Sequence, residues 1–228
     1  MINKNSFVIA VDGYASSGKS TLAKDLASKL NIVYIDTGAM YRAVTLYLLD
    51  KRIEISNTKE VSQALKDINI LFKINKYNNK NEVYLNDENV EEKIRDLRVS
   101  SLVSEVSAMK EVRDILLSQQ RSMVNYGSIV MDGRDIGTVV FPNADVKIFV
   151  YADEKERVNR RYKELFKKKN NTKHDEVLEN IRHRDHIDTT RKLAPLKQAD
   201  DAIRIDNTDI DVKEQLKIAL EHVQNKIK

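Results

Sequence analysis

The chain has 228 residues, of which 32% are charged and none is cysteine, and its formal net charge is +4. The lack of cysteine excludes disulfides, thiolate nucleophiles and cysteine zinc sites. The first apolar run ends at Asp12, too early for a signal peptide, and no run approaches the length of a membrane span. We therefore expect a cytoplasmic protein without a membrane partner. No Pro/Gly/Ser-rich linker divides the chain, which favours a single domain over residues 1–228.

The positive charge is concentrated in one part of the chain. Residues 151–199 contain fourteen Lys or Arg and nine Asp or Glu, a surplus of five, so the remainder is close to neutral. A basic surface suits an anionic partner. The lysines Lys167, Lys168 and Lys169, taken alone, are better interpreted as solvated surface.

The first elements that the pattern predicts are a strand from about Ser6 to Asp12 and a helix from about Lys19 to Leu30. The loop between them has the form G-x-x-x-x-G-K-[ST] and consists of Gly13, Tyr14, Ala15, Ser16, Ser17, Gly18, Lys19, Ser20 and Thr21. In this setting main-chain N–H groups and the helix N-terminus can surround phosphate oxygens. Lys19 can reach the outer phosphates, and the Ser20 hydroxyl can bind the magnesium ion of a triphosphate.

A second strand, Ile32–Asp36, leads into a helix that begins at about Thr37. Two parallel strands joined by a helix place their carboxyl ends at one edge of a sheet, so we expect Asp36 beside the phosphate loop. Thr37 can cap the helix that follows. Arg42 lies just over one turn inside it and could bind a second phosphate group, with an ordinary surface arginine as the alternative.

The character of the chain changes between about Asn57 and Asn89. A short amphipathic helix precedes alternating apolar residues from Ile68 to Ile74 and then Val83 to Leu85, which predicts a hairpin whose turn spans Tyr77 to Asn81. Antiparallel strands within a parallel architecture indicate an insertion, expected to be a small mobile lobe. Two further helices are predicted, of which the first carries Ser104 and the second Arg113.

The remaining elements return to the parallel sheet. A strand from Ser128 to Asp132 ends in Asp-Gly-Arg-Asp-Ile-Gly-Thr, so Asp132, Arg134 and Asp135 are expected at the same sheet edge as the phosphate loop. After this strand the pattern predicts a further strand at Val146–Val150 and then two helices. The first helix begins at about Glu154 and carries Arg157, Arg160 and Arg161 on one face, and the second begins at about Asp175 and carries Arg184, Asp188 and Arg191 on one face. The last predicted elements are a strand at Ala202–Asp206 and a helix that carries Val212 to Ile227.

Four motifs together resemble those of the bacterial cytidylate kinase family, over essentially the whole chain. They are G-x-x-x-S-G-K-S-T, D-T-G-A-M-Y-R, D-G-R-D-I-G-T-V-V-F-P and R-x-L-A-P-L-x-x-A-D-D-A. The resemblance implies an α/β, P-loop nucleoside-monophosphate-kinase-like three-layer fold, with a five-stranded parallel sheet, a small antiparallel insertion that binds the monophosphate, and a helical lid. It implies a core at about 1–56, 108–152 and 200–228, a monophosphate-binding lobe at about 57–107, and the lid with its following helix at about 153–199.

The same resemblance implies phosphoryl transfer from ATP to CMP or dCMP with Mg²⁺, and it implies a role for individual residues. It assigns Arg42, Arg134 and Thr37 to the CMP phosphate, Ser104, Arg113 and Asp135 to the cytosine, Arg184, Asp188 and Arg191 to the ribose, and Arg157, Arg160 and Arg161 to ATP and the transferring phosphoryl. Of these, Lys19, Arg134, Asp135, Arg157 and Arg161 are the expected catalytic residues. Ser20 is the expected metal ligand, with Asp36 or Asp132 acting through water.

General chemistry agrees with this interpretation. The phosphate of CMP is already anionic at neutral pH, so no general base is needed, and His174, His183, His186 and His222 lie in no motif. A carboxylate at Asp135 would accept a hydrogen bond from the cytosine amine, so UMP should be a poor substrate.

Two alternatives remain at this stage. One is a P-loop kinase for another nucleotide or a small metabolite, and the other is a nucleotide-binding switch or nucleic-acid-stimulated ATPase. Against the second, the chain has no N-K-x-D motif, and its basic residues follow helical faces rather than aromatic-interleaved stripes. We expect a monomer that does not bind nucleic acid.

Overall fold

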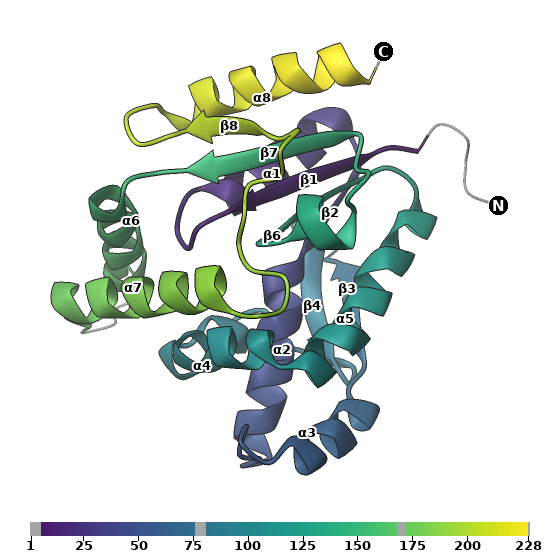
Figure 1. Ribbon diagram of the computed structural model, residues 1–228, viewed down its shortest axis with the longest axis vertical. Coiled ribbons are helices and arrows are strands. Elements are labelled where there is room, and N and C mark those ends of the chain that lie inside the picture. The colour runs from purple at the N-terminus through teal and green to yellow at the C-terminus, as the bar shows by residue number, and fades with distance from the viewer. Residues whose placement is uncertain (1–5, 76–80, 168–171, 228) are drawn as a thin grey trace. The chain divides into compact units, whose positions relative to one another are not determined.

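A computed structural model describes residues 6–75, 81–167 and 172–227 of the protein, and Figure 1 shows its helices and strands. The chain divides into two compact units. The phosphate-loop unit contains residues 1–34 and 123–228, and the central unit contains residues 35–122. The predicted turn residues from Tyr77 to Lys80, and the lysines Lys168 and Lys169, lie outside the described residues.

The phosphate-loop unit is built on a five-stranded sheet. The strands of this sheet are β1 (Val8–Gly13), β2 (Val33–Asp36), β6 (Ile129–Gly133), β7 (Val146–Tyr151) and β8 (Ile203–Asp206), in the order β2-β6-β1-β7-β8. The last two residues of β2, Ile35 and Asp36, are counted with the central unit. β1 pairs in parallel with both β6 and β7, and β7 pairs in parallel with β8. Because β1 is the middle strand, its carboxyl end reaches the centre of the sheet edge.

Two helices pack on this sheet, α1 (Lys19–Leu30) and α8 (Val212–Lys226). Leu22 and Leu26 of α1, together with Val223 of α8, belong to one buried cluster with the strand residues Ile9, Val11, Val130, Val146, Ile148, Val150 and Ile205. Burying one such side chain contributes about 1.5–3 kcal/mol, so the cluster fixes α1, and with it the end of the phosphate loop, against the sheet. The unit also contains the 3₁₀ helix η3 (Met123–Tyr126) and the π-helix η4 (Ile136–Val140).

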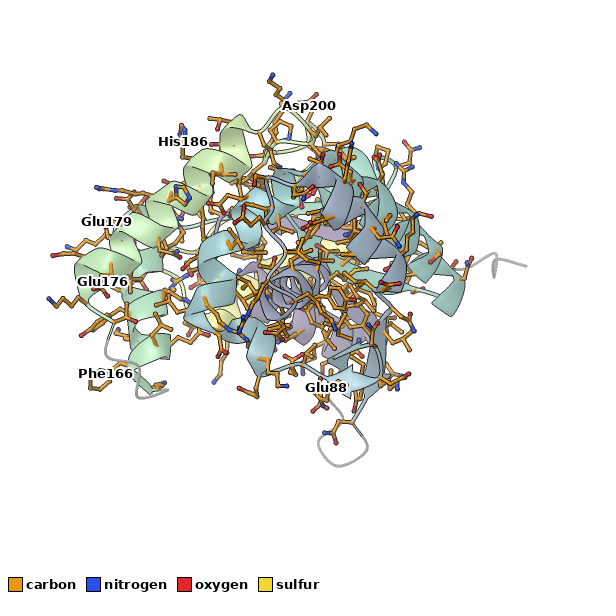
Figure 2. All side chains as sticks on the ribbon, turned by 90° about the horizontal axis from the view of Figure 1, so that it is seen from below. Glu88, Phe166, Glu176, Glu179, His186 and Asp200 are labelled. Carbon is orange, nitrogen blue, oxygen red and sulfur yellow. The ribbon has the colours of Figure 1, made fainter. Side chains whose placement is uncertain are left out.

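The helices α6 (Glu154–Lys167) and α7 (His174–Thr190) lie side by side and have a small hydrophobic cluster of their own (Figure 1). Val158 and Leu165 of α6 pack with Val177 and Ile181 of α7 in this cluster. The side chains of Glu176, Glu179 and His186 are exposed on α7, and Figure 2 labels them along the helix. The pair is therefore amphipathic, with a buried seam and a solvated outer face.

The central unit combines helices with a second, smaller sheet. Its elements are α2 (Thr37–Asp50), α3 (Thr58–Ala64), η1 (Leu65–Asp67), β3 (Ile70–Ile74), β4 (Asn81–Leu85), β5 (Glu88–Asn89), η2 (Lys93–Arg95), α4 (Leu97–Ala108) and α5 (Lys110–Ser122). β3 pairs antiparallel with β4, and β4 with β5, which confirms the predicted hairpin. Helix α2 packs against α4 and α5.

The expected cap of α2 was wrong by one residue. Asp36 is the N-cap, and its Oδ1 accepts the main-chain N–H of Ala39 at 2.8 Å. Thr37 is the first helical residue instead. The physical reason is that an N-cap needs extended backbone and an acceptor that reaches the third helical residue, and Asp36, at φ −90° and ψ 95°, meets both conditions.

The predicted fold class is confirmed, since the protein has an α/β fold with a five-stranded sheet and a small antiparallel sheet. Every helix among the described residues is too short or too polar to cross a membrane.

Candidate active site

The phosphate loop connects the end of β1 to the start of α1. Gly18 is the N-cap of α1 with φ 93°, and a Cβ placed there would lie 2.5 Å from Nδ2 of Asn207. A Cβ at Gly13 would lie 2.2 Å from the main-chain oxygen of Val150. Neither position can hold a side chain without displacing its neighbour. The first N–H groups of α1 have no acceptor within a helix, as at every helix start, so the loop ends at an anion-binding position.

Lys19 and Ser20 open helix α1 on the side of the loop. The Lys19 ammonium donates to the main-chain oxygen of Tyr14 at 3.1 Å, which keeps its charge above the loop. The Ser20 hydroxyl donates to Oδ2 of Asp132 at 2.6 Å, and the Tyr34 hydroxyl donates to Oδ1 of the same carboxylate at 2.7 Å. Hydroxyl and carboxylate oxygens are the ligand types that Mg²⁺ prefers, so Ser20 with Asp132 fits that ion chemically.

Asp36, the other acidic residue predicted near a metal, is engaged within the central unit. Besides capping α2, its carboxylate accepts a hydrogen bond from Arg42 Nη2 at 2.9 Å, and Arg95 Nη2 lies 3.9 Å away. A metal role for Asp36 stays a prediction, and it would compete with these contacts.

Residues predicted to bind the acceptor come together after β6 and on α7. Arg134 Nε donates to Oδ2 of Asp188 at 2.8 Å, with side chains only 16% and 5% exposed. Burial alone would raise the pKa of Asp188, but the guanidinium groups of Arg134, Arg184 and Arg191 hold that pKa below its ordinary value. Asp188 is therefore ionised at neutral pH, and it organises three arginines around one carboxylate.

Arg191 lies at the end of α7 and faces Asp135. Its Nη2 is 3.6 Å from Oδ1 of Asp135, and its Nε donates to the main-chain oxygen of Ala194 at 2.9 Å. Ala194 has φ 47° and precedes Pro195, a combination that is sterically unfavourable for a residue with a side chain. This strained turn aims the Ala194 carbonyl at Arg191 and so fixes the guanidinium beside Asp135.

Arg157 contacts the phosphate loop directly. Its Nη1 donates to the main-chain oxygen of Ala15 at 3.2 Å and to Oδ2 of Asp185 at 2.5 Å, and its Nε donates to the oxygen of Ala152. Its guanidinium also lies 5.2 Å from the centre of the Tyr14 ring. The side chain is buried, so the loop and α7 both hold this charge in a defined place.

The other two arginines of α6 have different partners. Arg160 donates to Oδ1 of Asn207 at 2.9 Å and to its main-chain oxygen at 2.7 Å, and Asn207 in turn borders Gly18. Arg161 pairs with Glu164 of its own helix at 2.9 Å. Thus Arg157 and Arg160 are linked to the phosphate loop, whereas this ion pair of Arg161 stays within α6.

In the central unit, the residues predicted for the base are connected to each other. Ser104 is buried, and its main-chain oxygen accepts the Ser107 hydroxyl at 2.9 Å. The main-chain oxygen of Ser107 then accepts Arg113 Nη1 at 3.1 Å. The Arg113 guanidinium lies 5.7 Å from the centre of the Tyr41 ring. Tyr41 directly precedes Arg42 in helix α2. Thr37 is also buried, at the start of the same helix as Arg42.

Sequence reasoning missed one acidic residue, Asp12. Its Oδ1 accepts the N–H of Ile136, and its Oδ2 accepts the N–H of Gly137, each at 2.8 Å. Burial raises the pKa of Asp12 to about 7, although both N–H donors act in the opposite direction. The only signal in the sequence was a charged residue that ended an apolar strand directly before Gly13.

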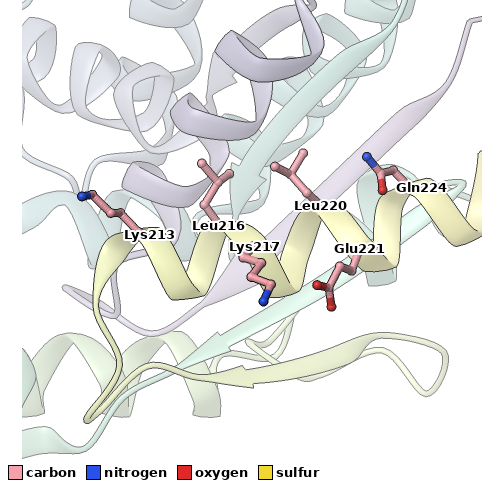
Figure 3. Close-up of a pocket in the computed structure, with 6 residues that line it drawn as sticks. All are labelled: Lys213, Leu216, Lys217, Leu220, Glu221 and Gln224. Atoms are coloured by element: carbon pink, nitrogen blue, oxygen red, sulfur yellow. The ribbon is translucent and has the colours of Figure 1, made fainter.

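A hollow on α8 is lined by six residues, Lys213, Leu216, Lys217, Leu220, Glu221 and Gln224 (Figure 3). It contains none of the residues that the sequence predicts for the site. We therefore place the candidate site at the phosphate loop and the arginine cluster, which the geometry above connects.

The class of protein follows from three features of this site. They are a central parallel strand, a loop that has no room for side chains at its two glycines, and buried arginines around that loop, and together they define a P-loop phosphotransferase. Comparison with known proteins gives the family. The sequence matches the family described as cytidylate kinase over residues 9–225, and the chain belongs to that family.

Individual relatives agree with this assignment. A cytidylate kinase of Fusobacterium nucleatum is 49% identical over 210 residues, which cover 92% of this chain and 94% of the relative. A cytidylate kinase of Bacteroides fragilis is 48% identical over 223 residues, covering 96% and 97%. An uncharacterized protein of Eubacterium ventriosum has a solved structure that matches with a TM-score of 0.52, at 13% identity, over 96% of this chain and 99% of that one, and it shows similarity of fold alone.

Proposed function

We propose that the protein transfers the γ-phosphoryl group of ATP to CMP or dCMP. An oxygen of the monophosphate attacks the γ-phosphorus in line, the bond to the β-phosphate oxygen breaks, and the products are ADP and CDP or dCDP. The observation that carries this proposal is the group formed by Arg134, Asp135, Asp188 and Arg191. It brings guanidinium groups that can bind a phosphate and carboxylates that can bind a base or a ribose into one cluster, which one triphosphate does not require. The names of the relatives support the same substrates.

The phosphate loop is proposed to bind ATP. The N–H groups of residues 13–21 would surround the phosphates, and Lys19 would neutralise their outer oxygens. The contacts of Arg157 and Arg160 with Ala15 and Asn207 support a role at the donor, since both charges are already held against the loop. We propose that Arg157 and Arg161 stabilise the transferring group, with Arg161 moving from its present partner.

Mg²⁺ is part of the proposal. Ser20 would hold the ion directly, with Asp132 acting through water, and the contact between these two side chains supports the assignment. When bound, the ion would supply neutralisation of phosphate charge. Asp36 is the alternative partner.

The acceptor residues keep in this proposal the roles that the motifs imply. The phosphate of CMP would be bound by Arg42, Arg134 and Thr37. The ribose would be bound by Arg184, Asp188 and Arg191, and the base would be bound by Ser104, Arg113 and Asp135. Arg191 Nη2, 3.6 Å from Asp135 Oδ1, would help to orient this carboxylate, which is proposed to accept a hydrogen bond from the cytosine amine. UMP presents a carbonyl at that place, so a buried acceptor would face another acceptor.

We keep the division into functional parts as a proposal with the bounds given above: a core, a monophosphate-binding lobe at about 57–107, and a lid at about 153–199 that excludes water during transfer. The proposal further includes action as a monomer in the cytoplasm, without nucleic acid or membrane.

The test is an acceptor panel. Purified protein with ATP and Mg²⁺ is assayed with AMP, GMP, UMP, CMP, dCMP and shikimate, and ADP formation is measured. We expect CMP and dCMP to be used best. Preference for any acceptor without cytosine would reject the substrate assignment, and ATP hydrolysis that rises with RNA or DNA while no monophosphate is used would favour the nucleic-acid-stimulated ATPase instead.

A further inference from the structure

We propose that Asp12 is a positioning residue for recognition of the acceptor base, and this inference rests on the proposed function. It acts by holding the main chain that follows Arg134 and Asp135. The motifs gave it no role, because it lies one residue before the phosphate loop.

The Asp12 side chain binds the main chain through both of its oxygens. Each of its two oxygens accepts one main-chain N–H, from Ile136 and Gly137, at 2.8 Å. Asp12 itself is only 5% exposed, so water does not compete for these oxygens. Two hydrogen bonds from successive N–H groups to the two oxygens of one side chain fix both the position and the orientation of a peptide segment.

The segment that is fixed begins the π-helix η4. The main-chain oxygen of Asp135 accepts N–H groups from both Val139 and Val140, at 2.9 and 3.1 Å, so Asp135 is the residue from which this irregular turn starts. A π-helical turn is unfavourable in isolation and is frequent at functional sites. Asp12 therefore supplies the outside contact that holds the turn, and with it the direction in which the Asp135 side chain leaves the chain.

The same carboxylate belongs to the central strand. β1 pairs with β6 so that Asp12 lies opposite Gly133, and Gly13 follows as the first residue of the phosphate loop. Asp12 thus links the main chain of the donor loop to the main chain of the acceptor-binding segment within one rigid sheet. A base-recognising carboxylate needs this kind of support, since small displacements of a positioned group have large effects on rate.

The first test is Asp12→Asn. The amide keeps one acceptor but turns an NH₂ group toward an N–H, so one of the two hydrogen bonds is lost and two donors face each other. We expect KM for CMP to rise about tenfold and the preference for CMP over UMP in kcat/KM to fall about tenfold, the size of one lost buried hydrogen bond. KM for ATP should change less than about threefold.

Two further variants make the test specific. Asp145→Asn is the matched control, because the Asp145 carboxylate accepts the N–H of Val8 at 2.8 Å at the opposite end of β1, and it should leave the CMP-to-UMP preference unchanged. Asp12→Ser is the second variant, because it keeps at most one acceptor for the N–H groups of Ile136 and Gly137 and does not turn an NH₂ group toward them. It should reproduce the effect of Asp12→Asn, and it decides alone if Asp12→Asn does not fold.

The outcomes separate this inference from the proposed function. If the unmodified protein does not use CMP, the proposed function fails before any variant is examined. If it uses CMP and the variants lower kcat with unchanged KM for CMP and unchanged preference over UMP, Asp12 is an ordinary structural residue and the inference is overturned.

Discussion

Replacement of Gly18 by alanine tests whether the phosphate loop is as tightly packed as its geometry indicates. The new Cβ would lie 2.5 Å from Asn207 Nδ2, where a normal contact is about 3.5 Å, so one of the two groups must move by about 1 Å. Either movement disturbs the loop or releases Arg160 from Asn207. Misplacement by about 1 Å can cost about 100-fold in rate, and we expect a loss of that order in kcat/KM for ATP.

Gly127→Ala is the matched control for this substitution. Gly127 also has positive φ, 108°, but no heavy atom among the described residues would lie within 4 Å of a Cβ added there. Both variants carry backbone strain of about 1–2 kcal/mol, and Gly18→Ala additionally loses about 1–2 kcal/mol of hydrogen bonding. Gly127→Ala should lower Tm by about 2–8 °C, Gly18→Ala by roughly twice as much.

The assay combines thermal unfolding with steady-state kinetics at varied ATP. Gly127→Ala should keep its kinetic constants within about twofold of the unmodified protein. If Gly18→Ala matched Gly127→Ala in both Tm and kcat/KM for ATP, the close approach of Asn207 to the loop would affect neither stability nor activity. That result would refute the inference that tight packing around Gly18 is needed for ATP use.

Three further predictions follow from contacts in the phosphate-loop unit. Lys19→Ala should abolish turnover, with a loss of at least about 100-fold, while circular dichroism shows an unchanged fold, because the ammonium is proposed to neutralise the phosphates; substantial remaining activity would contradict this. Tyr34→Phe removes the 2.7 Å hydrogen bond to Asp132 and should raise the Mg²⁺ concentration for half-maximal activity about tenfold, and an unchanged Mg²⁺ requirement would argue against Asp132 as a metal partner. The pKa of Asp12 is raised from 3.8 to about 7, because burial and, to a smaller extent, Asp135 raise it by more than the N–H groups of Gly137 and Ile136 and the charge of Arg134 lower it. The folded state therefore binds a proton that the unfolded state has lost, and its stability should fall as pH rises from about 4 to 7. Urea unfolding of the unmodified protein and Asp12→Asn should therefore show a difference in unfolding free energy that declines by about 3 kcal/mol between about pH 5 and 8, and a constant difference would exclude the raised pKa.

The order and type of the main elements could be predicted because they depend on local patterns. The alternation of apolar residues predicted a hairpin, and the antiparallel pairing of β3 with β4 confirms it. Helical spacing predicted the helix α1, which spans Lys19–Leu30. The cap of α2 was misplaced because Asp36 and Thr37 are both good capping residues. Only the backbone conformation at Asp36 decides between them.

The candidate site could be predicted as a set of residues but not as a set of contacts. Motif resemblance located the arginines, and their roles remain proposals. The pairing of Arg157 with Asp185 joins two helices across 28 positions, and no local pattern carries that information. Asp12 was missed for a related reason: an acid at the end of a strand looks the same in a sequence whether it faces water or two buried N–H groups.

The carboxylates that hold Arg134 and Arg157 bear on how readily and how selectively the proposed site would bind a nucleotide. An arginine side chain loses about 2 kcal/mol of rotamer freedom when it becomes ordered. Asp188 and Asp185 already hold these two side chains in the folded protein, so a nucleotide that bound them as proposed would not have to order them itself. Its phosphates would compete with the two carboxylates for guanidinium groups of fixed orientation, and an anion of another shape would find neither arginine free to adjust to it.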